Sequence, residues 1–431
     1  MPRRILQAGL LRVADPRYGS TVVDRRKLGV SIGASVNSVA TVCPPDRRRS
    51  QLLPKCESGV CMLGAFPPPV HGMAMVNAGM YKHLCRRGTL PLVLDLAPAS
   101  LERGWLNRLG RLRKVAKACI RYLWEILGGR GCTLYVGLSG GWGQLYEALF
   151  VSIARLRGAR IFLHHHSFAY LDRSKLPARW LVQLAGSSAT HVVICETQGR
   201  KLSQCYPTAS RTKVVSNAAI MDRAGDTKHR PRTSIQSVGF LGNISREKGI
   251  LEVLAIAERL KGQGADFDVY IAGPFENATV ESAVQETVAR LPTVKYVGPR
   301  YGSEKESFWD LIDILLFPSQ YSNETAPLVV HEAMAHGIPV IAWARGCLSD
   351  MVTVDSGVLV PPDQDFVAVA VEHLLEWQRD PAVLAAMSSA SAKDFSEQHD
   401  KSRDNLVALL DELTSGTKLA LTWPKNGINS H

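Results

Sequence analysis

Hydrophobic positions along the chain form short apolar runs that alternate with longer stretches of helical periodicity. The first group of runs lies at 59–66, 91–96, 134–138, 160–166, 191–195 and 213–217, and the second at 237–242, 268–273, 294–298 and 313–317. Short buried strands that alternate with helices are typical of parallel sheets with crossover helices. The pattern therefore predicts an α/β protein with two Rossmann-like, doubly wound domains that face each other across a cleft.

The two groups of runs divide the 431-residue chain into six predicted segments. These are a basic, mobile extension at 1–55, an N-terminal Rossmann-like domain at 56–217, a linker at 218–235, a C-terminal Rossmann-like domain at 236–398, a helix at 399–414 that crosses back to the first domain, and a loose tail at 415–431. The linker and the tail are polar and punctuated by loop-forming residues, which is typical of segments outside a packed core.

Composition narrows the class of protein further. A hydrophobic content of 46% with 21% charged residues is ordinary for a globular protein. No apolar run is long enough to span a membrane, and no signal-peptide pattern follows Met1, so we expect a cytoplasmic protein. Its nine cysteines are scattered without a Cys-x-x-Cys pair, which predicts free thiols rather than disulfides or a zinc site.

The net charge of +12 is concentrated at the N-terminus. Residues 1–50 carry ten Lys or Arg against three Asp or Glu, which accounts for +7. Such a charge can attract nucleic acid, but no recognition motif accompanies it. We therefore expect no nucleic-acid partner.

One stretch, at 317–339, combines the end of an apolar run with a polar loop and a short apolar helix. Pro327 suits the first helical turn, and Gly337 is typical of the helix end. A carboxylate on a buried helix needs a partner, which makes Glu332 an anomaly. Glu324 lies in the preceding loop, close to a helix start whose free N–H groups favour an anion. Two carboxylates that can accept sugar hydroxyls beside such a helix start indicate a nucleotide-sugar site.

The spacing Glu-x7-Glu within Pro-Ser…Glu-x-x-Pro-Leu…Glu-Ala-Met-Ala-x-Gly-x-Pro-Val resembles the signature of retaining glycosyltransferases of family 4, which have the GT-B fold. The resemblance implies that the domain at 56–217 binds the acceptor and that the domain at 236–398 binds the nucleotide-sugar donor. Within the second domain, it implies that Glu332 binds the ribose hydroxyls of the nucleotide and that Glu324 contacts the donor sugar. Backbone N–H groups around the turn would hold the sugar and the phosphate, and this turn consists of Thr325, Ala326, Pro327 and Leu328. The alternative interpretation is that both glutamates are ordinary capping or salt-bridge residues.

The loop at 243–249 carries the diphosphate-binding residues that the resemblance implies. The family usually has an arginine at the place of Asn243 and a lysine at the place of Lys248. The lysine is present, and Arg246 in the same loop is the candidate replacement for the arginine. The helix dipole disfavours a cation at a helix start, which argues that Lys248 has an anionic partner rather than being a solvated lysine.

In the N-terminal domain, the run at 160–166 ends in three histidines. Side chains of a strand alternate between its faces, so the three cannot ligate one metal ion, and we expect no metal site. The family places a histidine at this strand end against the donor sugar, where His166 fits by position, although all three could be structural or solvated. The family has a glycine loop after the first strand, and Gly72 is the residue of this sequence that matches it. The neighbouring His71 could face the cleft or be solvated.

Two further features of this domain could serve binding. The glycine cluster at 139–144 could cradle a phosphate or an acceptor, or it could only form a tight turn. In 103–123, seven Lys or Arg residues are interleaved with tryptophan, leucine and isoleucine. A basic amphipathic helix of this kind suits an anionic membrane surface, and the alternative is a core-facing helix with a solvated basic face. We predict peripheral attachment to the inner face of the plasma membrane.

The resemblance implies a metal-independent, retaining glycosyltransferase of the hexosyltransferase type, with His166, Glu324 and Lys248 as catalytic residues. It would move a sugar from a nucleoside-diphosphate sugar to a carbohydrate or lipid-linked acceptor in polysaccharide or glycolipid biosynthesis, with no cofactor besides this co-substrate. The alternatives are a nucleotide-sugar 2-epimerase on the same fold and an inactive binding protein related to glycosyltransferases. A nicotinamide-dependent dehydrogenase is disfavoured, because no Gly-x-Gly-x-x-Gly follows a first strand.

Overall fold

The computed structural model describes residues 59–68, 70–97, 105–129, 133–221 and 232–415, without the side chains of 105–109. The predicted extension at 1–55 lies outside the described residues, as do most of the predicted linker and almost all of the predicted tail. No helix within the described ranges is long and apolar enough to cross a membrane.

The first part of the described chain forms a six-stranded parallel sheet in the order β2-β1-β3-β4-β5-β6. Its strands are β1 (Val60–Gly64), β2 (Leu92–Asp95), β3 (Thr133–Leu138), β4 (Arg160–His165), β5 (Thr190–Val193) and β6 (Arg211–Val214). Its helices are α1 (Gly72–Arg86), α2 (Trp105–Leu127), α3 (Gln144–Leu156), α4 (Leu176–Ala185), α5 (Glu196–Cys205) and α6 (Asn217–Ile220). All residues of β1 and β3 are buried, as expected for strands that helices cover on both faces.

The second sheet is also six-stranded and parallel, in the order β12-β11-β10-β7-β8-β9. Its strands are β7 (Ser237–Leu241), β8 (Asp268–Ala272), β9 (Val294–Tyr296), β10 (Ile314–Phe317), β11 (Val340–Trp343) and β12 (Gly357–Val360). Its helices are α7 (Ile250–Gly262), α8 (Ala278–Arg290), α9 (Ser303–Leu311), α10 (Leu328–Ala335), α11 (Leu348–Met351) and α12 (Phe366–Arg379). The predicted α/β architecture with two doubly wound domains is therefore confirmed.

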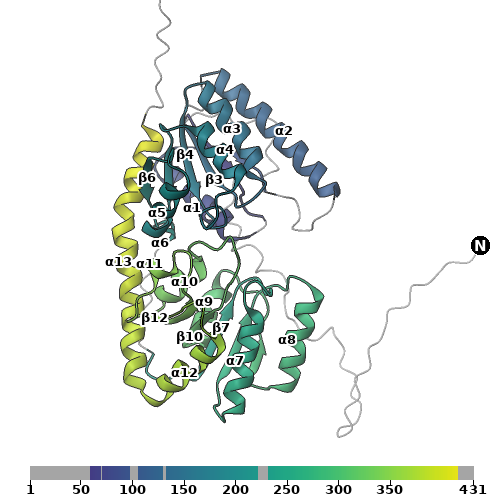
Figure 1. The fold of residues 1–431 in the computed structure, drawn as a ribbon, viewed down its shortest axis with the longest axis vertical. Coiled ribbons are helices and arrows are strands. Elements are labelled where there is room, and N and C mark those ends of the chain that lie inside the picture. Colours follow the sequence, from purple (N-terminus) through teal and green to yellow (C-terminus); the bar gives the residue numbers. More distant parts are fainter. Residues whose placement is uncertain (1–58, 69, 98–104, 130–132, 222–231, 416–431) are drawn as a thin grey trace, which may run out of the picture. The chain divides into compact units, whose positions relative to one another are not determined.

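The last helix, α13 (Pro381–Thr414), serves the cores of both domains. Near its start, Leu384 packs in the core of the second domain, and near its end Leu406 and Leu410 pack with α1 against the first sheet. Figure 1 shows α13 in yellow, running alongside both domains. The domain boundary predicted between 398 and 399 thus lies inside one continuous helix.

The second sheet reverses its strand order at β7, because β8 and β9 lie on one side of it and β10 to β12 lie on the other. In doubly wound sheets the loops after the two strands at such a switch point diverge, and ligands bind there, beyond the carboxyl ends of the strands. The two loops here are 242–249 after β7 and 318–327 after β10. They carry Lys248 and Glu324.

The pairing of cysteines differs from the sequence-based expectation. Cys195 and Cys347 form a disulfide bond, whereas their scattered positions predict free thiols. Among the described residues, Cys85, Cys119 and Cys205 have free thiols. The expectation of free thiols is wrong for Cys195 and Cys347. They are 152 positions apart in the sequence, and only the packing of the two domains brings them together.

Candidate functional site

Lys248 and Glu324 meet where the loops after β7 and β10 come together. The Lys248 ammonium contacts a carboxylate oxygen of Glu324, and the Ser319 hydroxyl donates a hydrogen bond to the same oxygen over 2.9 Å. The side chains of Lys248 and Glu324 are 23% and 14% exposed. A cation held in such a place can bind an anion, and the carboxylate beside it can accept a sugar hydroxyl.

Backbone contacts hold these two loops together. Gly249 has a φ of +83°, and a Cβ atom at this position would lie 2.3 Å from the carbonyl oxygen of Pro318. The N–H of Gln320 donates to the carbonyl oxygen of Glu247 over 2.8 Å. Glycine is therefore required at position 249 for its backbone conformation and for the close approach of the loops. The backbone thus sets the place of Lys248 relative to Glu324.

Glu332 lies on α10, and its partner is Lys305 of α9. The Lys305 ammonium is 2.6 Å from a carboxylate oxygen of Glu332. Burial raises the pKa of Glu332, and attraction to Lys305 offsets part of that rise. The anomaly of a glutamate on a buried helix is thus explained by a cation that sequence reasoning missed, because Lys305 precedes Glu332 by 27 residues in another helix.

The other residues predicted to bind the donor lie in the same two loops or at the start of α10. Asn243 and Arg246 are exposed in the loop after β7. Thr325 and Ala326 are buried after β10, Pro327 is the N-cap residue of α10, and Leu328 is its first residue. Arg246 therefore lies two positions from Lys248, in the loop at the carboxyl edge of the second sheet.

His166 follows the carboxyl end of β4 in the first domain. Its ring centre lies 4.1 Å from that of His164, and its Nε2 atom is buried without a hydrogen-bond partner among the described residues. Burial and, to a smaller extent, the nearby His71 lower the pKa of His166 to about 3. At neutral pH the ring is uncharged, so it can offer a hydrogen bond without placing a positive charge in the site.

His165 points away from this pair. Its ring nitrogens lie 2.9 Å from the Tyr170 hydroxyl and 3.0 Å from Nδ1 of His191. The three consecutive histidines therefore do not converge. Within the described ranges, no three His, Cys, Asp or Glu side chains gather as metal ligands.

The loop after β1 brings His71 close to His166. His71 accepts a hydrogen bond from the N–H of Ala74 over 3.4 Å and so caps α1. Burial lowers the pKa of His71, and attraction to Asp95 offsets part of that effect. Of the two roles open to His71, the solvated one is thereby disfavoured. Gly72 is exposed at the start of α1 with open space around its Cβ position, so nothing there requires a glycine.

Two polar contacts join the loops of the two domains. The Ser167 hydroxyl donates to Oδ1 of Asn323 over 2.8 Å, and Nδ2 of Asn217 donates to the carbonyl oxygen of Ala326 over 2.8 Å. A Cβ atom on Gly140 would lie 2.0 Å from Oδ1 of Asn323. The glycine cluster at 139–144 therefore faces the loop that carries Glu324, which requires glycine at position 140. No sequence signal links Ser167 to Asn323, because they are 156 residues apart.

A cavity of about 400 Å³ lies between the two domains. Its walls include Asp172 and Lys201 from the first domain and Gln320 and Arg345 from the second. Gln320 belongs to the loop after β10, so the cavity borders the candidate site. A second cavity of about 580 Å³, between β12, α12 and α13, contains none of the predicted site residues.

The buried carboxyl group of Glu147 should make the free energy of unfolding depend on pH. It is buried under the glycine cluster, where the N–H of Ser139 donates to it over 3.0 Å, and burial raises its pKa to about 7. The free energy of unfolding should therefore fall as the pH rises from about 4.5 to about 7, because the folded protein must ionise a buried carboxyl. The variant Glu147→Gln keeps an acceptor oxygen and should gain up to about 3 kcal/mol over wild type between pH 5 and pH 8.

Chemical denaturation of both proteins at pH 5 and pH 8 measures this gain. Glu304→Gln, which removes one exposed carboxylate, is the control. The same difference in unfolding free energy at both pH values would show that Glu147 does not titrate in this range.

Comparisons with known proteins agree with this architecture. HepE of Anabaena in complex with UDP superposes with a TM-score of 0.59 at 17% identity, over 82% of this chain and 99% of that one. A sucrose-phosphate synthase of Thermosynechococcus elongatus superposes with a TM-score of 0.61 at 17% identity over the same shares. The fold is therefore GT-B, as predicted, with two Rossmann-like domains.

The family-model match lies in the second domain of this chain. Residues 235–377 match the model of glycosyl transferases group 1. A GDP-mannose-dependent alpha-mannosyltransferase of Mycobacterium tuberculosis is 30% identical over 37% of this chain and 39% of its own. A 2-deoxystreptamine glucosyltransferase of Streptomyces kanamyceticus is 31% identical over 38% and 42%. The chain thus spans about two fifths of the length of these curated relatives. Residues 235–377 are thus similar to group 1 glycosyl transferases, and membership of family 4 stays a prediction.

Proposed function

We propose that the protein is a retaining glycosyltransferase that moves a sugar from a nucleoside-diphosphate sugar to a carbohydrate or lipid-linked acceptor. The observation that carries the proposal is the arrangement of Lys248, Glu324 and Glu332 around the start of α10, at the switch point of the second sheet. The matched family model covers this arrangement, and the relatives named as mannosyl- and glucosyltransferases support the class.

Each group in the site has a proposed role. Glu332 accepts the ribose hydroxyls, and the N–H groups at the start of α10 together with Lys248 and Arg246 hold the diphosphate. As the bond from sugar to phosphate breaks, negative charge grows on the diphosphate, and the Lys248 cation stabilises it without a metal ion. Glu324 and the neutral His166 orient the sugar and stabilise its oxocarbenium-like charge. No side chain is assigned as a nucleophile, so we infer a front-face displacement assisted by the departing phosphate.

Thermal-shift measurements with UDP- and GDP-linked sugars test the donor class, because a ligand that binds only the folded protein raises its apparent stability. The best donor is then incubated with and without candidate acceptors. Transfer with retained anomeric configuration, undiminished by EDTA, is expected. A product that forms without an acceptor would indicate the 2-epimerase instead. Absence of both binding and turnover with every nucleotide sugar would refute the proposal.

We further propose that the first domain attaches to an anionic membrane surface, where a lipid-linked acceptor would lie. On α2, Arg113, Lys117, Ile120 and Trp124 are exposed on one face, while Tyr122 is buried in the core. α2 therefore has a core-facing side, as one interpretation expects, and an exposed face of basic and apolar side chains, as the other expects. Residues 103–109 also belong to the predicted basic helix, but their side chains lie outside the described part of the structure.

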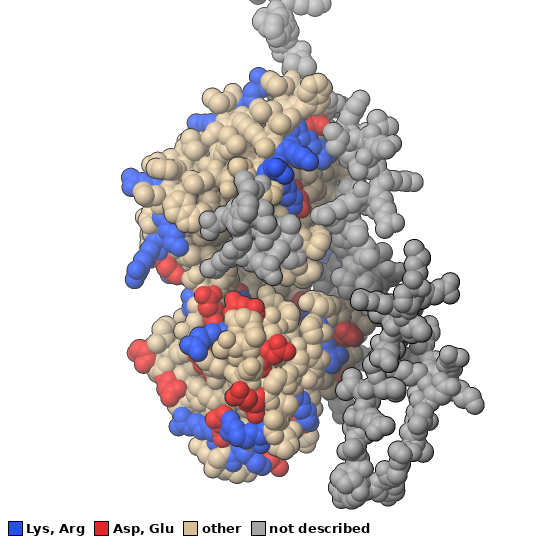
Figure 2. All heavy atoms as spheres, turned by 90° about the vertical axis from the view of Figure 1, so that its right-hand side faces the viewer, with Lys and Arg blue, Asp and Glu red and all other residues tan. Residues whose placement is uncertain are grey.

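The exposed apolar surface continues beyond α2. Leu145 and Leu149 on α3 and Leu176, Trp180 and Leu184 on α4 are all exposed. In the described residues from 105 to 188, Asp172 carries the only exposed carboxylate, since Glu125 and Glu147 are buried. On the face drawn in Figure 2, the half of the molecule built on the first sheet carries more Lys and Arg than Asp and Glu. Exposed tryptophan and leucine among cations suit the interface of an anionic bilayer.

Removing two of these cations should weaken membrane binding. Each Lys or Arg near an anionic surface contributes about 1 kcal/mol, so Arg113→Ala with Lys117→Ala should lower the partition coefficient roughly 30-fold at low salt. Co-sedimentation with phosphatidylglycerol and with phosphatidylcholine vesicles measures it. Lys261→Ala with Arg290→Ala on the second domain is the matched control. Equal binding to both kinds of vesicle would contradict the proposal.

A further inference from the structure

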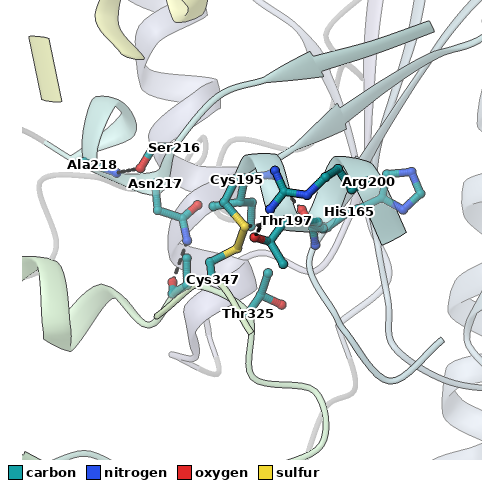
Figure 3. The surroundings of a disulfide bond; sticks show 12 residues. His165, Cys195, Thr197, Arg200, Ser216, Asn217, Ala218, Thr325 and Cys347 are labelled. Atoms are coloured by element: carbon teal, nitrogen blue, oxygen red, sulfur yellow. Dashed lines mark hydrogen bonds between the residues drawn. A yellow bond between two sulfur atoms is a disulfide. The ribbon is translucent and has the colours of Figure 1, made fainter. Parts of the chain in front are cut away.

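The Cys195–Cys347 disulfide bond joins the two domains beside the candidate site (Figure 3). Cys195 lies between β5 and α5, and Cys347 lies between β11 and α11, with their Cα atoms 5.9 Å apart. Both side chains are buried, and no feature of the proposed reaction uses either one. We propose that this pair is a reversible redox-modification site, and that its state controls the separation of the domains and thereby the geometry of the donor site.

On the second domain, the bond is tied to the loop that carries Glu324. The N–H of Cys347 donates to the carbonyl oxygen of Thr325 over 2.9 Å. The next carbonyl, that of Ala326, accepts the hydrogen bond from Asn217, which belongs to the first domain. Cross-linked Cys347 therefore holds the Glu324 loop against the first domain through its immediate neighbours.

On the first domain, the bond is tied to the strand end that carries His166. Cys195 is the N-cap residue of α5, and its sulfur accepts from the N–H of Gln198 over 3.4 Å. The Gln198 side chain donates to the carbonyl oxygen of His165 over 3.2 Å and accepts from the N–H of Ile194 over 2.7 Å. One glutamine thus connects Cys195 to the residue before His166. The cross-link is therefore connected by hydrogen bonds to the loop that carries Glu324 and to the strand end that precedes His166.

The chemistry is thiol–disulfide exchange. A thiolate of the reductant attacks Cys347, the bond to Cys195 breaks, and a second reductant thiol then releases Cys347. Two electrons and two protons pass to the pair while the reductant becomes a disulfide. The free N–H groups at the start of α5 stabilise negative charge on Cys195, which suits it as the leaving group. The cavity of about 400 Å³ is lined by Gly346, the residue before Cys347, and by Lys201 of α5, and so lies beside the two segments that carry the cysteines.

Given the proposed function, the cross-link restricts the opening of the two domains. Substrate entry and product release in enzymes with two facing domains require the domains to separate. In the oxidised protein a covalent bond opposes this motion at the donor loop. In the reduced protein the Ser167–Asn323 and Asn217–Ala326 hydrogen bonds remain as polar contacts between these loops, and such contacts break far more readily. Reduction should therefore speed opening and turnover.

Hydrogen exchange tests the conformational part without any turnover. The protein is equilibrated with oxidised glutathione or with dithiothreitol, and the cross-linked peptide is verified by mass spectrometry after thiol alkylation. Reduction should speed exchange at least about tenfold in 323–328 and at Cys347, because local opening sets these rates. The variant Cys195→Ser/Cys347→Ser should resemble reduced wild type under both conditions. The control Cys205→Ser, on the same α5 helix, should respond as wild type does.

Turnover tests the regulatory part. Reduced wild type should have a kcat at least about fivefold above that of the oxidised protein, and the double variant should be insensitive to redox state. Failure of oxidised glutathione to form the cross-link, or equal exchange in 323–328 in both states, would overturn the proposal. Equal kcat values in both states would overturn its regulatory part. If no nucleotide sugar supports turnover, the proposed function fails by itself, and the exchange measurement still decides whether the pair controls opening.

Discussion

Replacing Lys248 with alanine is expected to lower kcat by about 10²–10³-fold, because a fixed cation aimed at developing charge contributes that much to catalysis. Lys248 contacts Glu324 at the switch point of the second sheet, and the loop that holds it is fixed by Gly249. The variant also frees Glu324 from its cation, although the Ser319 hydrogen bond remains. The dissociation constant for a nucleoside diphosphate should rise, and that for the corresponding monophosphate should change less.

Lys261→Ala is the control for this variant. Lys261 lies on α7, the helix that follows Lys248, and pairs with Asp266 in an exposed position. Its loss removes the same charge without touching the site, so kcat should stay within about twofold of wild type. Steady-state kinetics and nucleotide titrations measure both variants. A Lys248→Ala enzyme with wild-type kcat would rule out leaving-group stabilisation by this residue.

Replacing Glu332 with alanine is expected to weaken nucleotide binding roughly 10- to 100-fold. A hydrogen bond that involves a charged group contributes about 1.5–3 kcal/mol, and the proposed ribose contact would lose its carboxylate acceptor. Because the ribose is common to both ligands, the loss should be similar for a nucleoside monophosphate and a diphosphate. This pattern differs from that of Lys248→Ala, so the two variants separate the ribose contact from the phosphate contact.

Glu306→Gln is the matched control for Glu332→Ala. Glu306 is on α9 beside Lys305, it is 56% exposed, and its carboxylate faces His336. Removing its charge alters the electrostatics around Glu332 without removing the proposed ribose ligand. Isothermal titration with UDP and GDP and their monophosphates compares the proteins. Unchanged affinity in Glu332→Ala would contradict the ribose role, even if the enzyme were active.

Local sequence predicted the parts of the structure that depend on a few neighbouring residues. The apolar runs correspond to buried parallel strands, as at β1 and β7, because a strand covered on both faces must be apolar throughout. Asp365 caps α12 by accepting hydrogen bonds from the N–H groups of Val367 and Ala368, a local signal that aspartate commonly provides at a helix start. The family match of 235–377 covers the stretch whose glutamate spacing carried the resemblance.

The sequence by itself thus predicted the six strands of the first sheet, four of the six strands of the second sheet and the GT-B fold. It also predicted the loops that carry Lys248 and Glu324 and the helix that carries Glu332. Periodicity, capping and motif spacing act over about ten residues, so they could be recognised along the chain. Only the tertiary structure decided that Lys305 partners Glu332, that Gly140 faces Asn323 and that Cys195 bonds to Cys347. These contacts join segments that are distant in sequence, and they arise from the order of strands in each sheet and from the packing of one domain on the other.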